Sequence, residues 1–315
     1  MAGQGKNNLV SLNGILGLIS SFPLITYILE FFKDLVINMM KTAPVPKHIA
    51  LIMDGNRRYA KSKKLALSEG HSAGADSLIQ VLNTCYKLGV AHVTIYAFSI
   101  ENFNRSQEEV ETLFGLLRNR LSLLADNEDS YARINKIKVR IVGNKSLIPE
   151  DILHDLEAIE AKTNNLESYR VLNVCFPYTS RDDIAHSVRT ISYKVANNII
   201  RSSDVTLETL NENMYMGADT PPLDILVRTS GHTRLSDFML WQANDKCVIE
   251  FVDVLWPDFK FLNIVSVILK WSYYKTLEME EAYHTTSRKK EKKVPSPEIY
   301  ANLPPPPPLA SVTQS

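Results

Sequence analysis

Residues 48–60 read HIALIMDGNRRYA, and this stretch decides the fold. Residues 48–53 are mostly apolar and predict a strand that is buried on both faces, as strands of a parallel sheet are. A polar turn follows at once, with the sequence Asp54-Gly55-Asn56-Arg57-Arg58. Because ligands gather at the carboxyl ends of parallel strands, this turn is the first candidate for a functional site.

Apolar runs alternate with longer amphipathic stretches through the middle of the chain. The further predicted strands are residues 92–98, 137–142, 170–176, 223–227 and 247–254. The predicted helices are residues 72–88, 106–124, 149–164, 182–200, 237–243 and 261–274, and Ser106 to Glu109 reads as a capping box at the start of the second one. This alternation predicts one α/β domain with a mostly parallel sheet of about six strands, flanked by helices.

Two zones flank this domain, which we expect to span residues 45–277. Residues 1–44 contain a run without charged side chains, residues 7–29, which predicts a membrane-associating segment. It is diluted by Gly, Asn, Ser and Pro, so an interfacial helix, a spanning helix and a helix on the protein's own core are all compatible with it. A signal peptide is disfavoured, because Lys6 is the only basic residue before the run and no small-residue cleavage site precedes the domain. Residues 278–315 hold a basic cluster and the prolines of residues 304–308, which together predict a disordered tail. Alternatively, the prolines could recruit a proline-binding domain, or the basic cluster could bind anionic lipid.

Overall composition excludes several classes of protein. The 35 basic residues balance the 35 acidic ones, which argues against a nucleic-acid binder. Hydrophobic residues at 45% and charged residues at 22% are ordinary for a globular protein. Cys85, Cys175 and Cys247 are too far apart for a metal motif or a disulfide framework, so we expect buried thiols in a reducing compartment. The sequence contains neither of the glycine-rich motifs of nucleotide-binding loops, G-x-x-x-x-G-K-[ST] and G-x-G-x-x-G.

Arginine-rich loops follow three of the predicted strands, and they should meet at one edge of the sheet. Besides the turn at Asp54, they are residues 99–105 and residues 228–236, with residues 177–181 nearby. Guanidinium groups, backbone N–H groups and a helix N-terminus suit a phosphate or a diphosphate. Among them, Asp54 suits a bridging Mg²⁺, although it could instead cap the next helix. Arg228 and Arg234, taken singly, could equally form surface salt bridges.

These loops resemble the signatures of the cis-prenyltransferase (undecaprenyl diphosphate synthase) family. The first is HIALIMDGNRRYA with Glu69-Gly70-His71, the second is YAFSIENFNR at residues 96–105, and the third is RTSG at residues 228–231 with RLSDF at 234–238 and LWP at 255–257. The resemblance covers roughly residues 46–271 with the blocks in order. The aspartate-rich DDxxD motif of trans-type synthases does not occur. Tyr59, Ile100 and residues 175–179 resemble the eukaryotic dehydrodolichyl diphosphate synthase catalytic subunits, and the hydrophobic N-terminus and proline-rich tail resemble fungal members.

The resemblance implies a Mg²⁺-dependent transferase that condenses farnesyl diphosphate with successive isopentenyl diphosphates. The product would be a dehydrodolichyl-type polyprenyl diphosphate for dolichol synthesis and protein glycosylation. Asp54 would be catalytic and hold Mg²⁺, and Asn102 would be catalytic by orienting the substrate while the diphosphate accepts the proton. Substrate-binding roles are implied for Gly55, Asn56, Arg57, Arg58, Tyr59, His71, Ser99, Glu101, Phe103, Arg105, Arg228, Arg234 and Ser236. Without the family, His71 reads as a helix-capping residue and Phe103 as a core residue.

A growing hydrocarbon chain needs an apolar tunnel or the bilayer, because each buried CH₂ is worth about 0.8 kcal/mol. The predicted helices 72–88 and 106–124 are the natural tunnel walls. Their leucines are equally compatible with a plain core, and the wall candidates are Leu78, Leu82, Leu113 and Leu117.

Three departures from the family pattern bear on the site. Leu67 stands where an arginine is common, and the bacterial second Mg²⁺ ligand aligns with Val248, so that Glu250 is a doubtful substitute. No glycine follows Gly231, so the family's Arg-x-Gly motif is missing. We therefore expect a heteromer in which a partner similar to the Nogo-B receptor supplies this motif, with the apolar residues of the predicted helix 261–274 as the partner face.

Two other interpretations compete with this one. A non-catalytic scaffold subunit is disfavoured by the intact Asp54-Gly55-Asn56 loop, and a self-sufficient synthase would make shorter products. A lipid product and a membrane-seeking N-terminus place the protein at the cytosolic face of the endoplasmic reticulum membrane or on lipid droplets.

Overall fold

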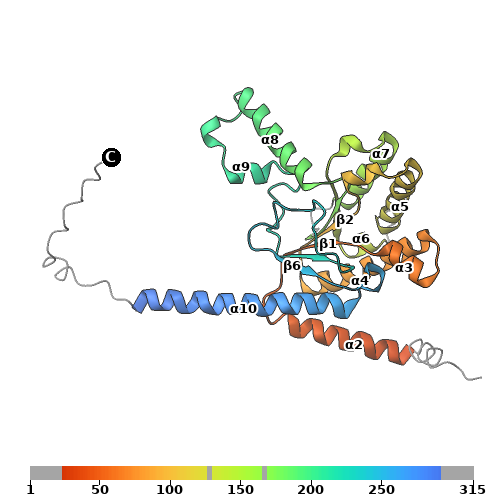
Figure 1. The fold of residues 1–315 in the computed structure, drawn as a ribbon. Helices are drawn as coiled ribbons and strands as arrows, with labels where there is room; N and C mark the ends of the chain where they lie inside the picture. The colour runs from red at the N-terminus through yellow and green to blue at the C-terminus, as the bar shows by residue number, and fades with distance from the viewer. Residues whose placement is uncertain (1–22, 126–129, 165–168, 292–315) are drawn as a thin grey trace, which may run out of the picture. The chain divides into compact units, whose positions relative to one another are not determined.

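A parallel sheet of six strands forms the centre of the computed structural model, which describes residues 23–125, 130–164 and 169–291 (Figure 1). The strands are β1 (His48–Ile52), β2 (His92–Tyr96), β3 (Ile137–Val142), β4 (Arg170–Cys175), β5 (Ile225–Arg228) and β6 (Val248–Phe251). Their order is β3-β4-β2-β1-β5-β6, and every neighbouring pair is parallel. The predicted α/β class, strand number and strand direction are confirmed.

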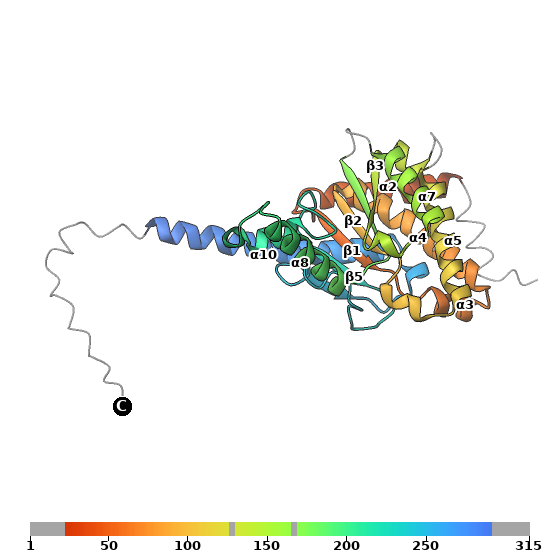
Figure 2. The ribbon, with the colours of Figure 1, turned by 90° about the horizontal axis from the view of Figure 1, so that it is seen from above.

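Helices connect the strands and cover the sheet (Figure 2). The α-helices are α2 (Pro23–Met40), α3 (Asn56–Lys63), α4 (Leu67–Leu88), α5 (Gln107–Ala125), α6 (Tyr131–Ile134), α7 (Glu150–Thr163), α8 (Ser180–Ala196), α9 (Leu207–Glu212) and α10 (Phe261–Glu291). Short 3₁₀ helices are η1 (Ile100–Asn104), η2 (Lys145–Leu147), η3 (Ser202–Asp204) and η4 (Trp256–Asp258). The chain divides into two compact units between Ser272 and Tyr273, and the sheet lies in the first.

Local chemistry sets the helix ends. The Ala66 N–H donates to the Glu69 carboxylate at 2.8 Å, and α4 ends at Gly89, whose φ of 103° suits a residue without a side chain. Half of the predicted capping box of α5 is present, because the Glu109 N–H donates to Ser106 Oγ at 3.4 Å. The Glu109 carboxylate instead accepts a bond from Arg105, which is part of the candidate site.

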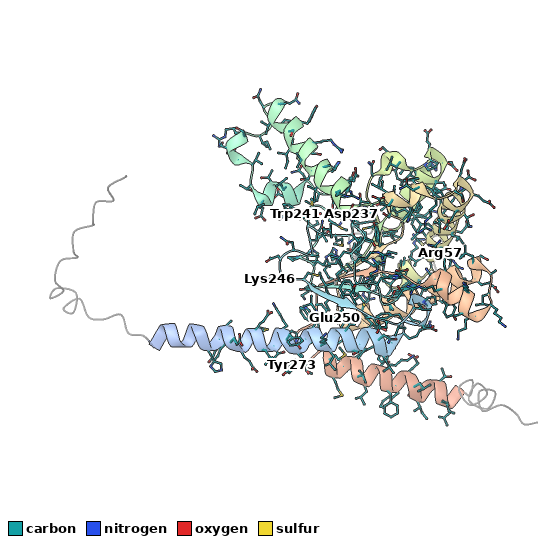
Figure 3. The ribbon with its side chains drawn as sticks, viewed as in Figure 1. Arg57, Asp237, Trp241, Lys246, Glu250 and Tyr273 are labelled. Atoms are coloured by element: carbon teal, nitrogen blue, oxygen red, sulfur yellow. The ribbon has the colours of Figure 1, made fainter. Side chains whose placement is uncertain are left out.

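The predicted helix at residues 237–243 does not form. Residues 236–243, which include the labelled Asp237 and Trp241, are turns and bends (Figure 3). Ser236, Asp237 and Met239 have φ values of 51°, 57° and 47°. Left-handed backbone at these positions is incompatible with a right-handed helix. Phe238 and Met239 are fully buried, so this loop packs against the sheet as an irregular segment.

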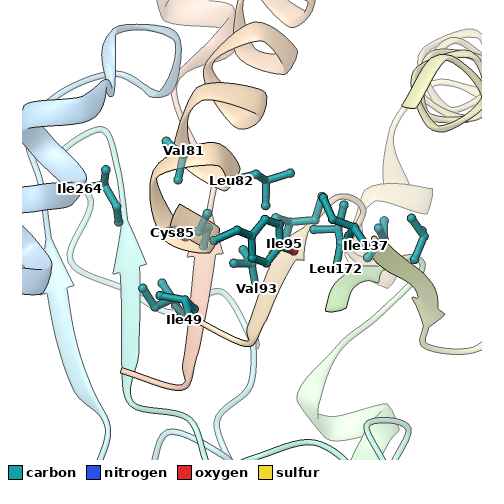
Figure 4. Close-up of a cluster of buried hydrophobic side chains, with 14 of the residues drawn as sticks. Ile49, Val81, Leu82, Cys85, Val93, Ile95, Ile137, Leu172 and Ile264 are labelled. Carbon is teal, nitrogen blue, oxygen red and sulfur yellow. The ribbon is translucent and has the colours of Figure 1, made fainter. Parts of the chain in front are cut away.

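The main hydrophobic core lies between the sheet and α4, α5 and α7. It includes Ile49 and Val93 of the sheet and Val81 and Leu82 of α4, as the close-up illustrates (Figure 4). Leu156 of α7 belongs to the same cluster. A second cluster lies on the opposite face, where Ala50 and Leu226 pack with Tyr178, Phe238 and Met239. Both faces of β1 are therefore covered, as its apolar sequence predicts.

The predicted partner face on residues 261–274 is largely wrong. Ile264, Ile268 and Trp271 are at most 6% exposed and belong to the protein's own core. Leu262 and Leu269 remain exposed on the same helix. The helix also continues to Glu291, so residues 278–291 of the predicted disordered tail are helical, and residues 292–315 lie outside the described residues.

The N-terminal helix α2 belongs partly to the folded domain. Ile37 and Met40 are buried in the main core, whereas Tyr27, Phe31 and Met39 are more than half exposed. Most of the uncharged run at residues 7–29 lies outside the described residues. Within the described part of the chain, no helix has both the length and the apolar character needed to cross a bilayer.

Candidate functional site

One large cavity, of about 1180 Å³, connects the carboxyl edge of the sheet with the space between α4, α5 and the sheet. Its polar end collects the loops after β1, β2 and β5. It is lined by the sequence-predicted residues Asp54, Gly55, Asn56, Arg57, Arg58, His71, Ser99, Glu101, Asn102, Arg105, Arg228, Arg234 and Ser236. Tyr59, Phe103 and Glu250 do not belong to this lining.

Asp54 is a half-buried carboxylate among positive groups. Its Oδ2 accepts a bond from Arg228 Nη2 at 2.9 Å, and His232 Nδ1 lies 3.2 Å and Arg58 Nη2 4.0 Å from the same oxygen. Burial acts to raise the pKa of Asp54, but hydrogen bonds from Arg228 and Ser230 and the charges of Arg228 and His232 outweigh it and leave the pKa below its usual value. Asp54 is therefore ionised and oriented at neutral pH.

Arg228 is 3% exposed and acts as the central support of this end of the cavity. One of its terminal nitrogens donates to the Arg234 carbonyl at 2.6 Å and to Ser236 Oγ at 2.7 Å, and the other donates to Asp54. Its planar, forked guanidinium thus joins the loops after β1 and β5. Arg228, which the sequence also predicts to bind substrate, therefore holds the predicted substrate-binding residues Arg234 and Ser236 in place.

The first turn of α3 provides a place for an anion. Gly55 precedes it with a φ of 114°, and a Cβ there would lie only 3.0 Å from Leu255 Cδ2. The first N–H groups of a helix have no intrahelical partner, and they carry the positive end of the helix dipole. Arg57 and Arg58 extend from the same turn and are half to two-thirds exposed, so backbone and side-chain donors face the cavity together.

The loop after β2 is ordered by its own side chains. Asn102 Oδ1 accepts a bond from the Ser99 N–H at 2.9 Å, while Ser99 Oγ accepts one from the Glu101 N–H at 3.2 Å. The Asn102 amide is therefore fixed in orientation, which suits a positioning role. The Glu101 carboxylate, which was predicted to bind substrate, instead accepts a hydrogen bond from Arg181 at 2.8 Å.

A second group of charges lies around His71. Arg105 Nη1 donates to Glu109 at 2.7 Å, and Arg57 lies 3.6 Å from the same carboxylate oxygen. Burial, and then the positive charges of Arg105 and Arg57, lower the pKa of His71. A neutral imidazole at neutral pH can accept or donate a hydrogen bond beside the cationic groups.

The other end of the cavity is apolar, as a hydrocarbon tunnel requires. Three of the four predicted wall leucines line it, namely Leu78, Leu113 and Leu117. Leu82 is fully buried and outside the lining, so the core alternative holds for that residue. Further apolar lining comes from the sheet and from α4 and α5, with Ile79, Ile95, Leu116, Leu121, Leu124 and Leu172. Phe103 stacks edge-on against Phe98 and is 37% exposed, so it packs beside the cavity wall.

Several charged or polar residues at the cavity were not among the sequence-predicted site residues. Arg181 and Asp237 line the polar end, His232 contacts Asp54, and Arg120 lines the wall and donates to Ser72 Oγ at 2.7 Å. Arg181 and His232 lie in the loops that the strand-end rule singled out, at residues 177–181 and 228–236, but no role was assigned to them, and Asp237 directly follows the second of these loops. Arg120 lies inside an amphipathic helix, where a polar residue carries no such signal.

A metal ion at this end would have few protein ligands. Among the described residues, no group of three or more His, Cys, Asp or Glu side chains could hold an ion. Glu250, the doubtful second ligand, forms a salt bridge with Lys270 at 2.7 Å and lies beside α10 (Figure 3). Asp54, an ionised carboxylate among cationic groups, is the residue of this site that would hold a Mg²⁺.

Comparisons with known proteins identify the family of the chain. A family model of undecaprenyl diphosphate synthase matches residues 52–276. The dehydrodolichyl diphosphate synthase complex subunit SRT1 of Saccharomyces cerevisiae is 39% identical, over 88% of this chain and 81% of its own, and the subunit Dhdds of Mus musculus is 42% identical, over 77% and 72%. The crystal structure of lavandulyl diphosphate synthase from Lavandula x intermedia, in complex with dimethylallyl diphosphate, superposes with a TM-score of 0.67 at 29% identity, covering 72% of this chain and 95% of that one.

A parallel α/β sheet with an arginine-rich edge above an apolar cavity, in a chain with these relatives, defines a synthase of prenyl diphosphates. More narrowly, the chain belongs to the undecaprenyl diphosphate synthase family, the cis-prenyltransferases.

Proposed function

We propose that the protein elongates a prenyl chain in cis, condensing farnesyl diphosphate with successive isopentenyl diphosphates to give a dehydrodolichyl-type polyprenyl diphosphate. The observation that carries this proposal is the cavity, which is cationic at one end and apolar at the other. Such a cavity complements a molecule with a diphosphate head and a hydrocarbon tail. The relatives named as dehydrodolichyl diphosphate synthase subunits support the dolichol-type product.

The residues divide into two diphosphate sites. The allylic diphosphate binds at the turn of Gly55, the first turn of α3 and Arg57. These donors line the same cavity as the side chains of α4 that form part of its apolar end. Arg234 and Ser236, held by Arg228, bind the diphosphate of isopentenyl diphosphate. This arrangement brings the two reacting carbons together and replaces a bimolecular encounter by a fixed geometry.

The reaction separates charge at the allylic carbon. The bond from C1 of the allylic substrate to its diphosphate oxygen breaks, and the double bond of isopentenyl diphosphate forms the new C–C bond with that carbon. Isopentenyl diphosphate then loses a proton from its own C2 to the diphosphate, which leaves the cis double bond. Fixed guanidinium and N–H donors stabilise the leaving group more than the ground state. Asn102 orients the incoming substrate, because its amide is already fixed by Ser99.

Asp54 is the residue that would hold Mg²⁺. When bound, this ion neutralises the charge of the departing diphosphate. The ionised, preoriented Asp54 carboxylate fits this role, and the surrounding arginines prevent it from repelling the diphosphate.

A partner subunit completes the site in our proposal. The relatives from yeast and mouse are named as subunits of a complex, and the Arg-x-Gly tripeptide of the family does not occur in the printed sequence. A partner similar to the Nogo-B receptor would supply that tripeptide. The scaffold interpretation is not favoured, because the catalytic loops meet at one cavity with Asp54 at its polar end.

The exposed apolar face of α2 supports membrane association at the cytosolic face of the endoplasmic reticulum or on lipid droplets. Tyr27, Phe31 and Phe32 are between 56% and 71% exposed on this helix, as is typical of an interfacial helix. Wild type should float with phosphatidylcholine–phosphatidylserine vesicles, and the double variant Phe31→Ser/Phe32→Ser should not. Leu262→Ser, which changes an exposed apolar residue of α10, is the matched control and should float. Flotation of the double variant would reject α2 as the anchor.

The decisive experiment is incorporation of labelled isopentenyl diphosphate with farnesyl diphosphate and Mg²⁺. The full chain is assayed alone and with a candidate partner, using Asp54→Ala and the surface variant Asp204→Ala as a control. Polyprenyl product in the mixture, lost with Asp54→Ala and kept with Asp204→Ala, is the expected result. Product that survives Asp54→Ala would place the activity in another chain, and long product from the chain alone would overturn the partner proposal.

A further inference from the structure

Arg181, at the start of α8, joins two of the loops that form the polar end of the cavity. Its Nε donates to Asp237 Oδ2 at 2.7 Å, and its Nη2 donates to Glu101 Oε1 at 2.8 Å. Its backbone N–H donates to Asp237 Oδ1 at 3.2 Å. All three side chains line the cavity. One guanidinium therefore connects the loop after β2, the start of α8 and the loop after β5.

The loop that Arg181 holds has an unusual backbone. Ser236, Asp237 and Met239 are not glycines, yet all have positive φ values. Such conformations persist only where the surroundings enforce them. Around Asp237 the enforcement comes from the first turn of α8, because the Ser180 N–H donates to the Asp237 carbonyl at 2.7 Å in addition to the bonds from Arg181.

Ser236, at which this strained backbone begins, has a functional hydroxyl. Ser236 Oγ accepts a bond from Arg228, and the Ser236 carbonyl accepts one from the Tyr96 hydroxyl at 3.2 Å. Arg234 precedes it by two residues. Release of Asp237 would let this segment relax toward ordinary backbone angles and move both diphosphate-binding groups.

We propose that Arg181 is a positioning residue of the condensation, which holds the loop of Arg234 and Ser236 against the loop of Asn102 and thereby shapes the isopentenyl diphosphate site. The proposal rests on the proposed assignment of Arg234 and Ser236 to that substrate. The allylic site depends on the first turn of α3. Among the described residues, Arg181 bonds to Asp237 and Glu101 and not to this turn, so the affinity for the allylic substrate should not change.

The exposures of the Arg181 and Asp237 side chains support an action through Asp237. The Asp237 side chain is 11% exposed and that of Arg181 is 73% exposed. An exposed ion pair by itself contributes little to stability. Here two backbone hydrogen bonds reinforce the pair, one from the Arg181 N–H to the Asp237 carboxylate and one from the Ser180 N–H to the Asp237 carbonyl. The pair therefore acts by fixing the geometry of the loop.

The test is steady-state kinetics of the active preparation, the full chain with its partner subunit where one is required. Arg181→Met should raise the KM for isopentenyl diphosphate roughly tenfold, because misplacement by a fraction of an ångström has effects of this size. The KM for farnesyl diphosphate should stay within about twofold. Arg181→Lys should rescue part of the loss, since it keeps a charge near Asp237. Arg201→Met, which removes an exposed arginine paired with Asp204, is the matched control and should behave as wild type.

A double-mutant cycle separates positioning from direct binding. If Arg181 acts through Asp237, then Asp237→Asn should raise the same KM, and the double variant should be no worse than either single one. Glu101→Gln provides a second partner variant should Asp237→Asn fold poorly. An increase with Arg181→Met but not with either partner variant would make Arg181 a direct ligand and overturn the proposal, as would an equal rise for both substrates. Failure of the proposed function would appear earlier, as absence of isopentenyl incorporation by wild type.

Discussion

Two helical glycines give a matched test of how the cavity is packed. Gly74 lies in α4 and Gly115 in α5, and both are replaced by alanine. A Cβ at Gly74 would overlap the side-chain oxygen of Asn56 and lie 3.0 Å from Trp256 Cδ1, whereas a Cβ at Gly115 would meet no atom within 4 Å. The two variants thus share the change in helix propensity and differ in the steric contact.

The magnitudes follow from this difference. Alanine in a helix interior gains about 1 kcal/mol over glycine. Gly115→Ala should keep this gain, whereas at Gly74 overpacking costs about 1–3 kcal/mol and cancels or reverses it. The unfolding free energies of the two variants should therefore differ by about 1–3 kcal/mol, or roughly 3–10 °C in thermal midpoint for a domain of this size.

Function supplies the second measurement. Asn56 begins α3 and lines the polar end of the cavity, so its displacement by Gly74→Ala should raise the KM for farnesyl diphosphate about tenfold, with Gly115→Ala unchanged. Thermal unfolding and isopentenyl incorporation are measured on both variants. Equal midpoints with equal kinetic constants would refute the reasoning, because they would mean that the Asn56 side chain can move without consequence.

Three further predictions concern the cavity, a buried histidine and the metal. Leu117→Trp, which fills the apolar end, should shorten the products separated by chromatography, whereas Leu82→Met, outside the lining, should not; unchanged lengths for both would argue against the tunnel. Burial holds the pKa of His48 at about 4, its ring lying between the Pro221 carbonyl and the Thr94 hydroxyl. The unfolded state then binds the extra proton between pH 6.5 and 4, so stability should fall by about 3 kcal/mol as the pH drops through this window. His48→Gln should flatten the pH dependence of the thermal midpoint, and an unaltered slope would contradict the assignment. Chelation with EDTA should abolish isopentenyl incorporation and excess Mg²⁺ should restore it, whereas activity in EDTA would remove the metal from the proposal.

The alternation of apolar runs was sufficient to predict the sheet. Each predicted strand overlaps an observed one. Strand β1 is buried on both faces and leaves an unbroken apolar signal, whereas residues 137–142 coincide with β3, in which Lys138 and Arg140 alternate with buried residues. The predicted helix at residues 237–243 failed for a tertiary reason. Its backbone is set by bonds from Ser180 and Arg181, which lie more than fifty residues earlier in the sequence.

The site was predictable as a set of loops and less so as a set of contacts. The strand-end rule and the family motifs placed Asp54, Asn102 and Arg234 at one cavity. Neither could show that Arg228 is buried and binds other site residues, since pairing partners depend on the fold. Tyr59 belongs to a signature block yet lies outside the cavity lining, because it follows the first turn of α3.

The polarity of the cavity also fixes the direction in which a chain would travel through it. New units join at the diphosphate end, so the oldest carbons are pushed farthest from the reacting atoms. The new bonds would thus form at the cationic end, far from the place where the tip of the chain would meet Leu117. A short starting substrate would reach Leu117 only after several additions. Evolution can consequently lengthen or shorten the product by altering the distant wall, while the first condensation proceeds at its original rate.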